Sequence, residues 1–299
     1  MSEKIGVECF AKILDRSRQL IQTRIWDGIC IENLLSWKNN FVTDEQKIFA
    51  AYVLDQLVYR NHNHMVAMFY DILTKRLHNV WRIESNDLYN DTANPLMLLK
   101  NKYGEIGLRY MAAVKEDDPE TKSGYRMVNL LNHQLQVSSN WNIRIKNIND
   151  AYTKNQIKNF ILFDDIICTG DQMCETLARI NFRQYHDAHF YVCVCAAHEH
   201  GLNKIKELYP HVSVVFAEKI PAYNNAFNLI QAQDLNLENT ESIREWYAEY
   251  MKGIHYRGAD VNGKGDLAML YAFQESVPNN SLPILFHQNT NKPLLLKRG

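Results

Sequence analysis

The chain lacks the features that mark several large classes of protein. None of its 299 residues belongs to an apolar run that approaches the roughly 20 residues of a membrane-spanning helix. The formal net charge of -1 argues against autonomous binding of DNA or RNA, because such binding depends on a basic surface. Neither GxxxxGK[ST] nor GxGxxG occurs, which disfavours P-loop and dinucleotide-binding folds.

Cysteine is sparse, and its spacing fits no disulfide framework. We therefore expect reduced thiols rather than a secreted domain held together by disulfide bonds. The first residues, MSEKIGVECF, do not show the basic stretch and apolar run of a secretion signal. Both observations lead us to expect a cytoplasmic protein without membrane attachment. The six cysteines are Cys9, Cys30, Cys168, Cys174, Cys193 and Cys195.

What remains is the composition of an ordinary globular chain. Hydrophobic residues make up 46% of the sequence and charged residues 22%, which is enough to build a sizeable core. This length allows one large domain or two modest ones.

The first hundred residues show apolar residues at helical spacing. Thr43 and Gln46 form a capping-box pattern that predicts the start of a helix, which we expect to continue through Tyr59. Another helix is expected between Met65 and Val80. We find no strand-like alternation here, so residues 1–100 are predicted to be an all-helical module.

From residue 101 onward, predicted strands alternate with predicted helices. This order predicts an α/β fold over residues 101–299, with a parallel sheet covered by helices on both faces. The strands are expected at residues 106–114, 160–163, 188–197, 212–217 and 267–273, and the helices at 125–136, 173–180, 201–209 and 240–252.

The most informative stretch is residues 160–172, FILFDDIICTGDQ. A buried strand is followed by Asp164 and Asp165, and then by a short loop with Thr169 and Gly170. Open α/β sheets bind ligands at the carboxyl ends of their strands. Loop amides suit a phosphate, whereas carboxylates suit sugar hydroxyls or a magnesium ion. A sugar phosphate matches both halves of the stretch.

This stretch resembles the phosphoribosyl-pyrophosphate loop of type I phosphoribosyltransferases. It is most similar to the phosphoribosyltransferase-like effector proteins of bacterial conflict and anti-phage systems, retron-associated proteins among them. There the loop ends in a Gly-Asn-Gln-like triplet, here Gly170-Asp171-Gln172. The likeness extends over residues 106–286, and the helical first hundred residues also match that branch. Cys168 and Gln172 stand where metabolic enzymes carry hydroxyl residues, and Asp171 adds a negative charge.

The resemblance implies roles for the acid pair and for the loop. Asp164 and Asp165 would bind the ribose 2- and 3-hydroxyls and Mg²⁺, and would stabilise the positive charge that develops on the sugar. The alternative is that one acid caps the following helix and the other is solvated. The remaining residues would hold the 5-phosphate, or would form an ordinary turn: Ile167, Cys168, Thr169, Gly170, Asp171 and Gln172.

Two further segments contain candidate ligand-binding residues. Lys122 and Ser123 follow the first strand of the α/β region, where the family places its pyrophosphate loop; a solvated acidic loop is the alternative. Tyr256 lies in a glycine-rich segment that would form the hood over the acceptor base, or a surface loop. His198 and His200 follow two strand cysteines, but HxH without a third placed ligand is a weak zinc motif.

The resemblance implies an enzyme that acts at the anomeric carbon of a ribose 5-phosphate ligand, such as a nucleotide or phosphoribosyl pyrophosphate. The reaction would be glycosyl transfer or N-glycosidic cleavage, with a biological role as a toxin in anti-phage defence. A partner such as a reverse transcriptase with its RNA-DNA product would restrain it. The alternative is a non-catalytic nucleotide or phosphoribosyl-pyrophosphate sensor, or an assembly subunit of a defence complex.

Overall fold

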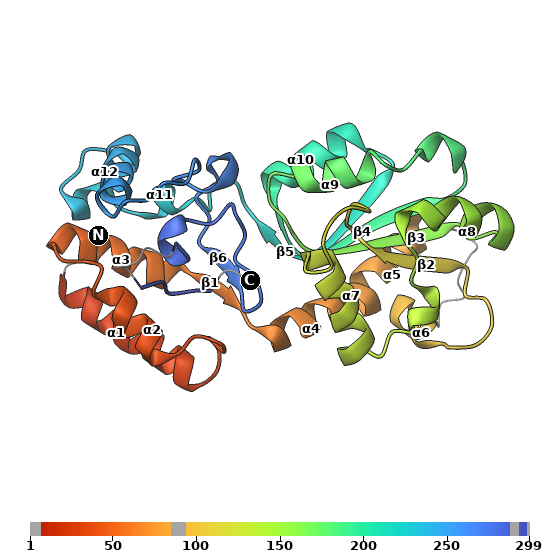
Figure 1. Ribbon diagram of the computed structural model, residues 1–299, viewed down its shortest axis with the longest axis horizontal. Helices are drawn as coiled ribbons and strands as arrows, with labels where there is room; N and C mark the ends of the chain where they lie inside the picture. Colours follow the sequence, from red (N-terminus) through yellow and green to blue (C-terminus); the bar gives the residue numbers. More distant parts are fainter. Residues whose placement is uncertain (1–6, 85–93, 288–292, 298–299) are drawn as a thin grey trace. The chain divides into compact units, whose positions relative to one another are not determined.

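The chain divides into two compact units (Figure 1). The computed structural model describes residues 7–84, 94–287 and 293–297. One unit, here called the helical unit, comprises Met1–Asn63 and Ala222–Gly299, and the other, the sheet unit, comprises His64–Pro221. Residues 64–100 of the predicted N-terminal module thus belong to the sheet unit. The predicted division at residue 100 stays a prediction.

The sheet unit is built on four parallel strands that lie in the order β2-β3-β4-β5. Helices connect successive strands, as parallel pairing requires. The predicted α/β fold is therefore confirmed. The strands are β2 (Leu108–Ala112), β3 (Asn159–Ile167), β4 (His189–His198) and β5 (Val212–Ile220). The helices are α4 (His62–Asp71), a π-helical segment (Ile72–Arg76), α5 (Leu77–Glu84), α6 (Pro95–Lys100), α7 (Ser123–Gln134), α8 (Ile148–Asn155), α9 (Asp171–Leu177) and α10 (Glu199–Leu208).

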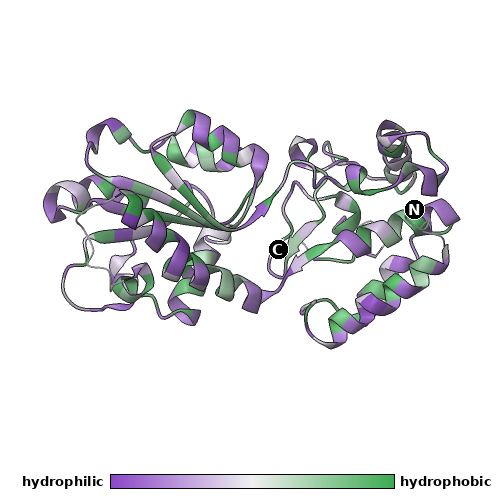
Figure 2. Ribbon diagram, turned by 180° about the vertical axis from the view of Figure 1, so that it is seen from behind, coloured by the Kyte–Doolittle hydropathy of each residue, from purple (hydrophilic) through white to green (hydrophobic). Residues whose placement is uncertain are grey.

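Helices cover both faces of this sheet (Figure 1). Because side chains alternate along a strand, Phe160 and Leu162 of β3 pack into the core formed with α8, α9 and α10. On the opposite face, Phe163 meets Phe69 of α4 with ring centroids 5.7 Å apart. The strands are largely green in Figure 2, as expected for a sheet that is buried on both sides.

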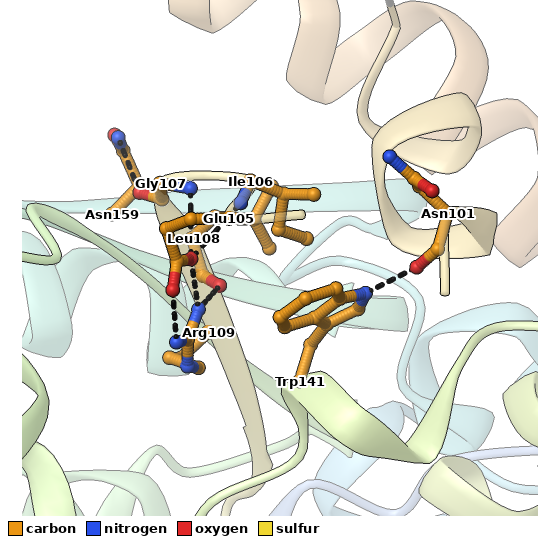
Figure 3. A network of polar contacts seen from close by, with 8 residues as sticks. All are labelled: Asn101, Glu105, Ile106, Gly107, Leu108, Arg109, Trp141 and Asn159. Carbon is orange, nitrogen blue, oxygen red and sulfur yellow. Dashed lines mark hydrogen bonds and ion pairs between the residues drawn. The ribbon is translucent and has the colours of Figure 1, made fainter. Parts of the chain in front are cut away.

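A buried arginine fixes the amino end of β2 (Figure 3). The two terminal nitrogens of Arg109 donate to the Glu105 carboxylate at 2.7 and 2.8 Å, and the guanidinium lies 5.1 Å from the centre of the Trp141 ring. The Trp141 indole donates to the carbonyl oxygen of Asn101 at 2.6 Å. These contacts attach the segment before β2 to the sheet, at the end opposite to the acid pair.

The helical unit has a large core that is rich in aromatic side chains. Its rings include Phe49, which stacks on Tyr247 with centroids 5.2 Å apart. The predicted capping box of Thr43 and Gln46 is confirmed at the start of α3. The elements are α1 (Val7–Gln22), α2 (Ile31–Lys38), α3 (Asp44–Gln56), β1 (Val58–Arg60), α11 (Ala226–Leu229), α12 (Thr240–Gly253) and β6 (Tyr271–Phe273), of which β1 and β6 pair in parallel.

Two predictions for this unit were wrong in their bounds. The helix expected to reach Tyr59 ends at Gln56, because Val58 donates its amide to Leu270 and starts β1. Its partner strand lies more than 200 residues later, beyond the reach of a local pattern. The strand expected over residues 267–273 starts only at Tyr271, since Ala268 has a φ of 44°. Across the described residues, no helix is long and apolar enough to span a membrane.

Candidate functional site

The acid pair lies inside β3, beyond the end of its neighbour β2. The pairing of β2 with β3 ends at Ala112 and Phe163, whereas β3 and β4 remain paired up to Ile167 and Ala197. The strand predicted to end at Phe163 is therefore four residues longer, because β4 supplies partners for the aliphatic residues after the acids. Asp164 and Asp165 thus lie at the carboxyl end of the parallel strands, where such sheets bind ligands, and next to the place where β2 stops.

Both carboxylates are almost fully buried, with 3% of Asp164 and 6% of Asp165 exposed. Oδ1 of Asp164 accepts hydrogen bonds from the Ser123 hydroxyl at 2.5 Å and from the Asp165 amide at 2.9 Å. The Gln172 amide approaches Oδ2 of Asp164 at 3.4 Å. Burial raises the pKa of the Asp164 carboxyl well above its ordinary value, and the neighbouring Asp165 raises this pKa further. The site therefore favours a ligand that brings positive charge or hydrogen-bond donors to this carboxylate.

The loop after β3 is short and packs on the first turn of α10. Gly170 adopts a φ of 82°, which favours glycine. A Cβ atom on Gly201 would lie 2.5 Å from the carbonyl oxygen of Cys168 and 2.6 Å from Cγ2 of Ile167. Gly201 thus allows residues 168–170 to contact α10 closely. The predicted helix began at Gly201, whereas α10 begins two residues earlier, at Glu199. A glycine in the first turn of a helix was the available signal for this close contact.

Asp171 is paired within the loop. The Thr169 hydroxyl donates to Oδ2 of Asp171 at 2.9 Å, and the Lys204 ammonium of α10 pairs with Oδ1. Lys204 was not among the predicted site residues, because only the packing of α10 beside the loop brings it to this place. The extra negative charge of Asp171 is therefore matched by a cation.

The remaining predicted residues have different surroundings. Ser123 contacts Asp164 directly, whereas the Lys122 ammonium lies 3.8 Å from a carboxylate oxygen of Asp118. Tyr256 belongs to the helical unit, where its ring meets His287 edge-on with centroids 4.6 Å apart. The acid pair, the loop and Ser123 form one constellation within the sheet unit.

A recess lies beside the carboxyl end of β2. Its volume is about 390 Å³, within the range of small-molecule pockets. Its lining carries charges of both signs, from Lys115, Arg144 and Glu116, and Tyr125 of α7 adds an aromatic ring. The Lys115 ammonium is paired with Glu175. The end of the sheet that carries the acid pair therefore also has a cavity lined by charged side chains.

Asp164 and Asp165 are suited to a magnesium ion that arrives with a phosphorylated ligand. Mg²⁺ prefers carboxylate oxygens, keeps several waters and takes further oxygens from phosphates. No group of three or more His, Cys, Asp or Glu side chains among the described residues could hold a metal by itself. His198 instead caps α10, where its Nδ1 accepts the His200 amide hydrogen at 3.2 Å. Cys193 and Cys195 are core thiols of β4, as expected.

Comparisons with known proteins place these features in a family. Residues 34–297 match the family model named PRTase-CE. Among solved structures, orotate phosphoribosyltransferase from Aeropyrum pernix is 12% identical with a TM-score of 0.24, and the match covers 38% of this chain and 59% of that one. The AQ2163 protein from Aquifex aeolicus is 10% identical with a TM-score of 0.29, over 63% of this chain and 84% of that one. No curated protein matches the sequence. Because the family model spans most of the chain, this phosphoribosyltransferase-like protein belongs to the PRTase-CE family.

Proposed function

We propose that the protein binds a ribose 5-phosphate ligand, a nucleotide or phosphoribosyl pyrophosphate, at the carboxyl end of β3 and acts at its anomeric carbon. The observation that carries this proposal is the pair of buried carboxylates, Asp164 and Asp165, near the carboxyl end of β3 and shortly before the loop that contains Thr169 and Gly170. Membership of the PRTase-CE family supports it.

In this proposal the carboxylates accept hydrogen bonds from the ribose 2- and 3-hydroxyls, and residues 167–172 surround the 5-phosphate. The bond between the anomeric carbon and the leaving group breaks, and its electron pair departs with that group. Positive charge then develops on the sugar, and an acceptor or a water molecule supplies the electron pair of the new bond. Buried negative charges stabilise such a transition state more strongly than solvated ones.

Both acids would contact the ribose. The Ser123 hydroxyl donates to Oδ1 of Asp164 and fixes the orientation of that carboxylate. Oδ1 of Asp165 accepts the adjacent Ile166 amide hydrogen at 2.8 Å. We assign the contacts with the ribose hydroxyls and the stabilisation of the developing positive charge to the two acids together. Mg²⁺, when bound, would neutralise phosphate oxygens next to both acids.

The remaining roles rest on the family resemblance. Lys122 and Ser123 are proposed to face the pyrophosphate, and Tyr256 the acceptor base. The proposed biological role is that of a cytoplasmic toxin in anti-phage defence, which a partner such as a reverse transcriptase with its RNA-DNA product restrains. The resemblance of residues 160–172 to the conflict-system proteins supports this role.

A second candidate is a non-catalytic sensor of nucleotides or phosphoribosyl pyrophosphate, or an assembly subunit. The observation in its favour is that the Thr169 hydroxyl is already engaged by Asp171, which weakens the loop as a phosphate site.

The test is to incubate the purified protein with phosphoribosyl pyrophosphate and a panel of nucleotides in the presence of Mg²⁺, and to search for new products by mass spectrometry. We expect a product with the wild type and none after Asp164→Asn combined with Asp165→Asn. Asp187→Asn is the matched control, because Asp187 pairs with Lys158 at the amino end of the sheet. Binding without turnover would favour the sensor. If the wild type neither binds nor converts any of these ligands, the proposal is wrong.

A further inference from the structure

We propose that the Asp171 carboxylate occupies the position of the ligand's 5-phosphate when no ligand is bound, and that Lys204 is the cation that serves both anions. This inference rests on the proposed function, because it concerns the phosphate half of the same site. It gives Asp171, a predicted residue of the phosphate loop, a specificity-determining role, and it adds Lys204, which the sequence pattern did not identify, as a phosphate-binding lysine.

The first support is that Asp171 engages the donors that a phosphate would need. The Thr169 hydroxyl donates to Oδ2 at 2.9 Å, while the Lys204 ammonium pairs with Oδ1. A hydroxyl and an ammonium converging on one anion are the donors typical of a phosphate site. These two donors are therefore engaged by an anion that belongs to the chain itself.

The second support is that the pair is exchangeable. The side chains of Lys204 and Asp171 are 38% and 37% exposed, so both can reach an incoming ligand. Exposed ion pairs of this kind contribute only ~0–1 kcal/mol, because water screens them. A phosphate monoester carries nearly two negative charges at neutral pH, against one on the carboxylate. It can therefore replace Asp171 at Lys204 without a large energetic barrier.

The third support is that the loop and the lysine are fixed to each other. Residues 168–170 pack on Gly201, and Lys204 follows Gly201 by one turn of α10. The backbone of Lys204 is therefore held near Thr169 by contacts that do not involve Asp171. When the Asp171 side chain turns away, the Lys204 ammonium and the Thr169 hydroxyl stay within reach of the same phosphate.

The consequence is that Asp171 lowers the affinity of the site for ligands with a 5-phosphate. A 5-phosphate must displace a carboxylate of the same sign, whereas a sugar without this phosphate leaves the pair of Asp171 and Lys204 intact. Asp171→Asn removes the competing charge and retains a side chain of the same size. Lys204→Gln removes the shared cation.

The experiment is isothermal titration calorimetry, in which ribose 5-phosphate is titrated with Mg²⁺ into the 299-residue chain and its variants. We expect Asp171→Asn to bind about fivefold more tightly than the wild type, which is ~1 kcal/mol, and Lys204→Gln about fivefold more weakly. The control is Glu175→Gln, which removes another paired acid of α9 that contacts Lys115 instead of the loop. Its affinity should stay within about twofold of the wild type, since screening weakens distant charges.

Two results would overturn the inference, and they differ in what they say about the proposed function. If the wild type binds ribose 5-phosphate and Asp171→Asn binds it equally or less tightly, the inference is wrong while the proposed ligand stands. If neither the wild type nor Asp171→Asn binds ribose 5-phosphate or phosphoribosyl pyrophosphate, the proposed function fails and this inference fails with it. Binding that appears only in Asp171→Asn supports both.

Discussion

Replacing Gly201 by alanine tests how closely the loop after β3 is held by α10. The new Cβ would lie 2.5 Å from the Cys168 carbonyl oxygen, 2.6 Å from Cγ2 of Ile167 and 3.0 Å from the Gly170 nitrogen. Two of these are backbone atoms, so a side-chain rotation cannot relieve the overlap. Overpacking costs ~1–3 kcal/mol, while alanine in a helix gains ~0.5–1 kcal/mol over glycine. The overlap outweighs the helix preference, and we expect a net loss of ~1–2 kcal/mol.

The assay is urea unfolding followed by circular dichroism, together with titration of phosphoribosyl pyrophosphate. His200→Ala is the matched control, because it places the same residue one position earlier on an exposed part of α10. That variant should change the free energy of unfolding by less than ~0.5 kcal/mol. We expect Gly201→Ala to weaken ligand binding as well, because the loop must move. A Gly201→Ala protein as stable as the wild type, with unchanged affinity, would refute the packing argument.

Three further predictions concern charge and burial. Asp164→Asn should be more stable than the wild type at pH 8 in EDTA, because burial and Asp165 raise the pKa of this carboxyl; in thermal melts the gap should shrink as the pH falls and the wild type takes up its proton. Glu105→Gln should be less stable at pH 7 by no more than ~1 kcal/mol, since Glu105 is half exposed. The bond from Arg109 lowers the Glu105 pKa below its ordinary value of 4.5, so this difference should vanish in urea titrations as the pH falls below that value. Tyr52→Phe removes the hydroxyl that donates to buried Asp234 at 2.7 Å and should cost ~1–3 kcal/mol in urea unfolding.

The order of residues 160–172 was enough to predict a buried strand, an acid pair and a glycine turn, because these features are local. The α/β fold followed from strands that alternate with helices. The exact end of β3 did not follow, because it depends on partners that β4 supplies up to Ala197. Local patterns also missed β1, whose partner β6 is distant in the sequence.

The contacts within the site were harder to predict than its motif. Ser123 is 41 residues from Asp164, and Lys204 is 33 residues from Asp171. Only the packing of α7 and α10 around the carboxyl ends of the strands brings these pairs together. Ser123 was predicted to bind pyrophosphate, and the sequence did not indicate that its hydroxyl donates to Asp164. The sequence therefore indicated candidate residues for the site, but not the hydrogen bonds between them.

The most direct test of the account is a binding isotherm for phosphoribosyl pyrophosphate with Mg²⁺, measured on the wild type and on Asp165→Asn. The wild type should bind, and the affinity should fall when Mg²⁺ is removed. Asp165→Asn should lose at least tenfold, or ~1.4 kcal/mol, while Asp187→Asn stays unchanged. Equal affinity of Asp165→Asn and the wild type would contradict the claim that the acid pair of β3 is the ribose site.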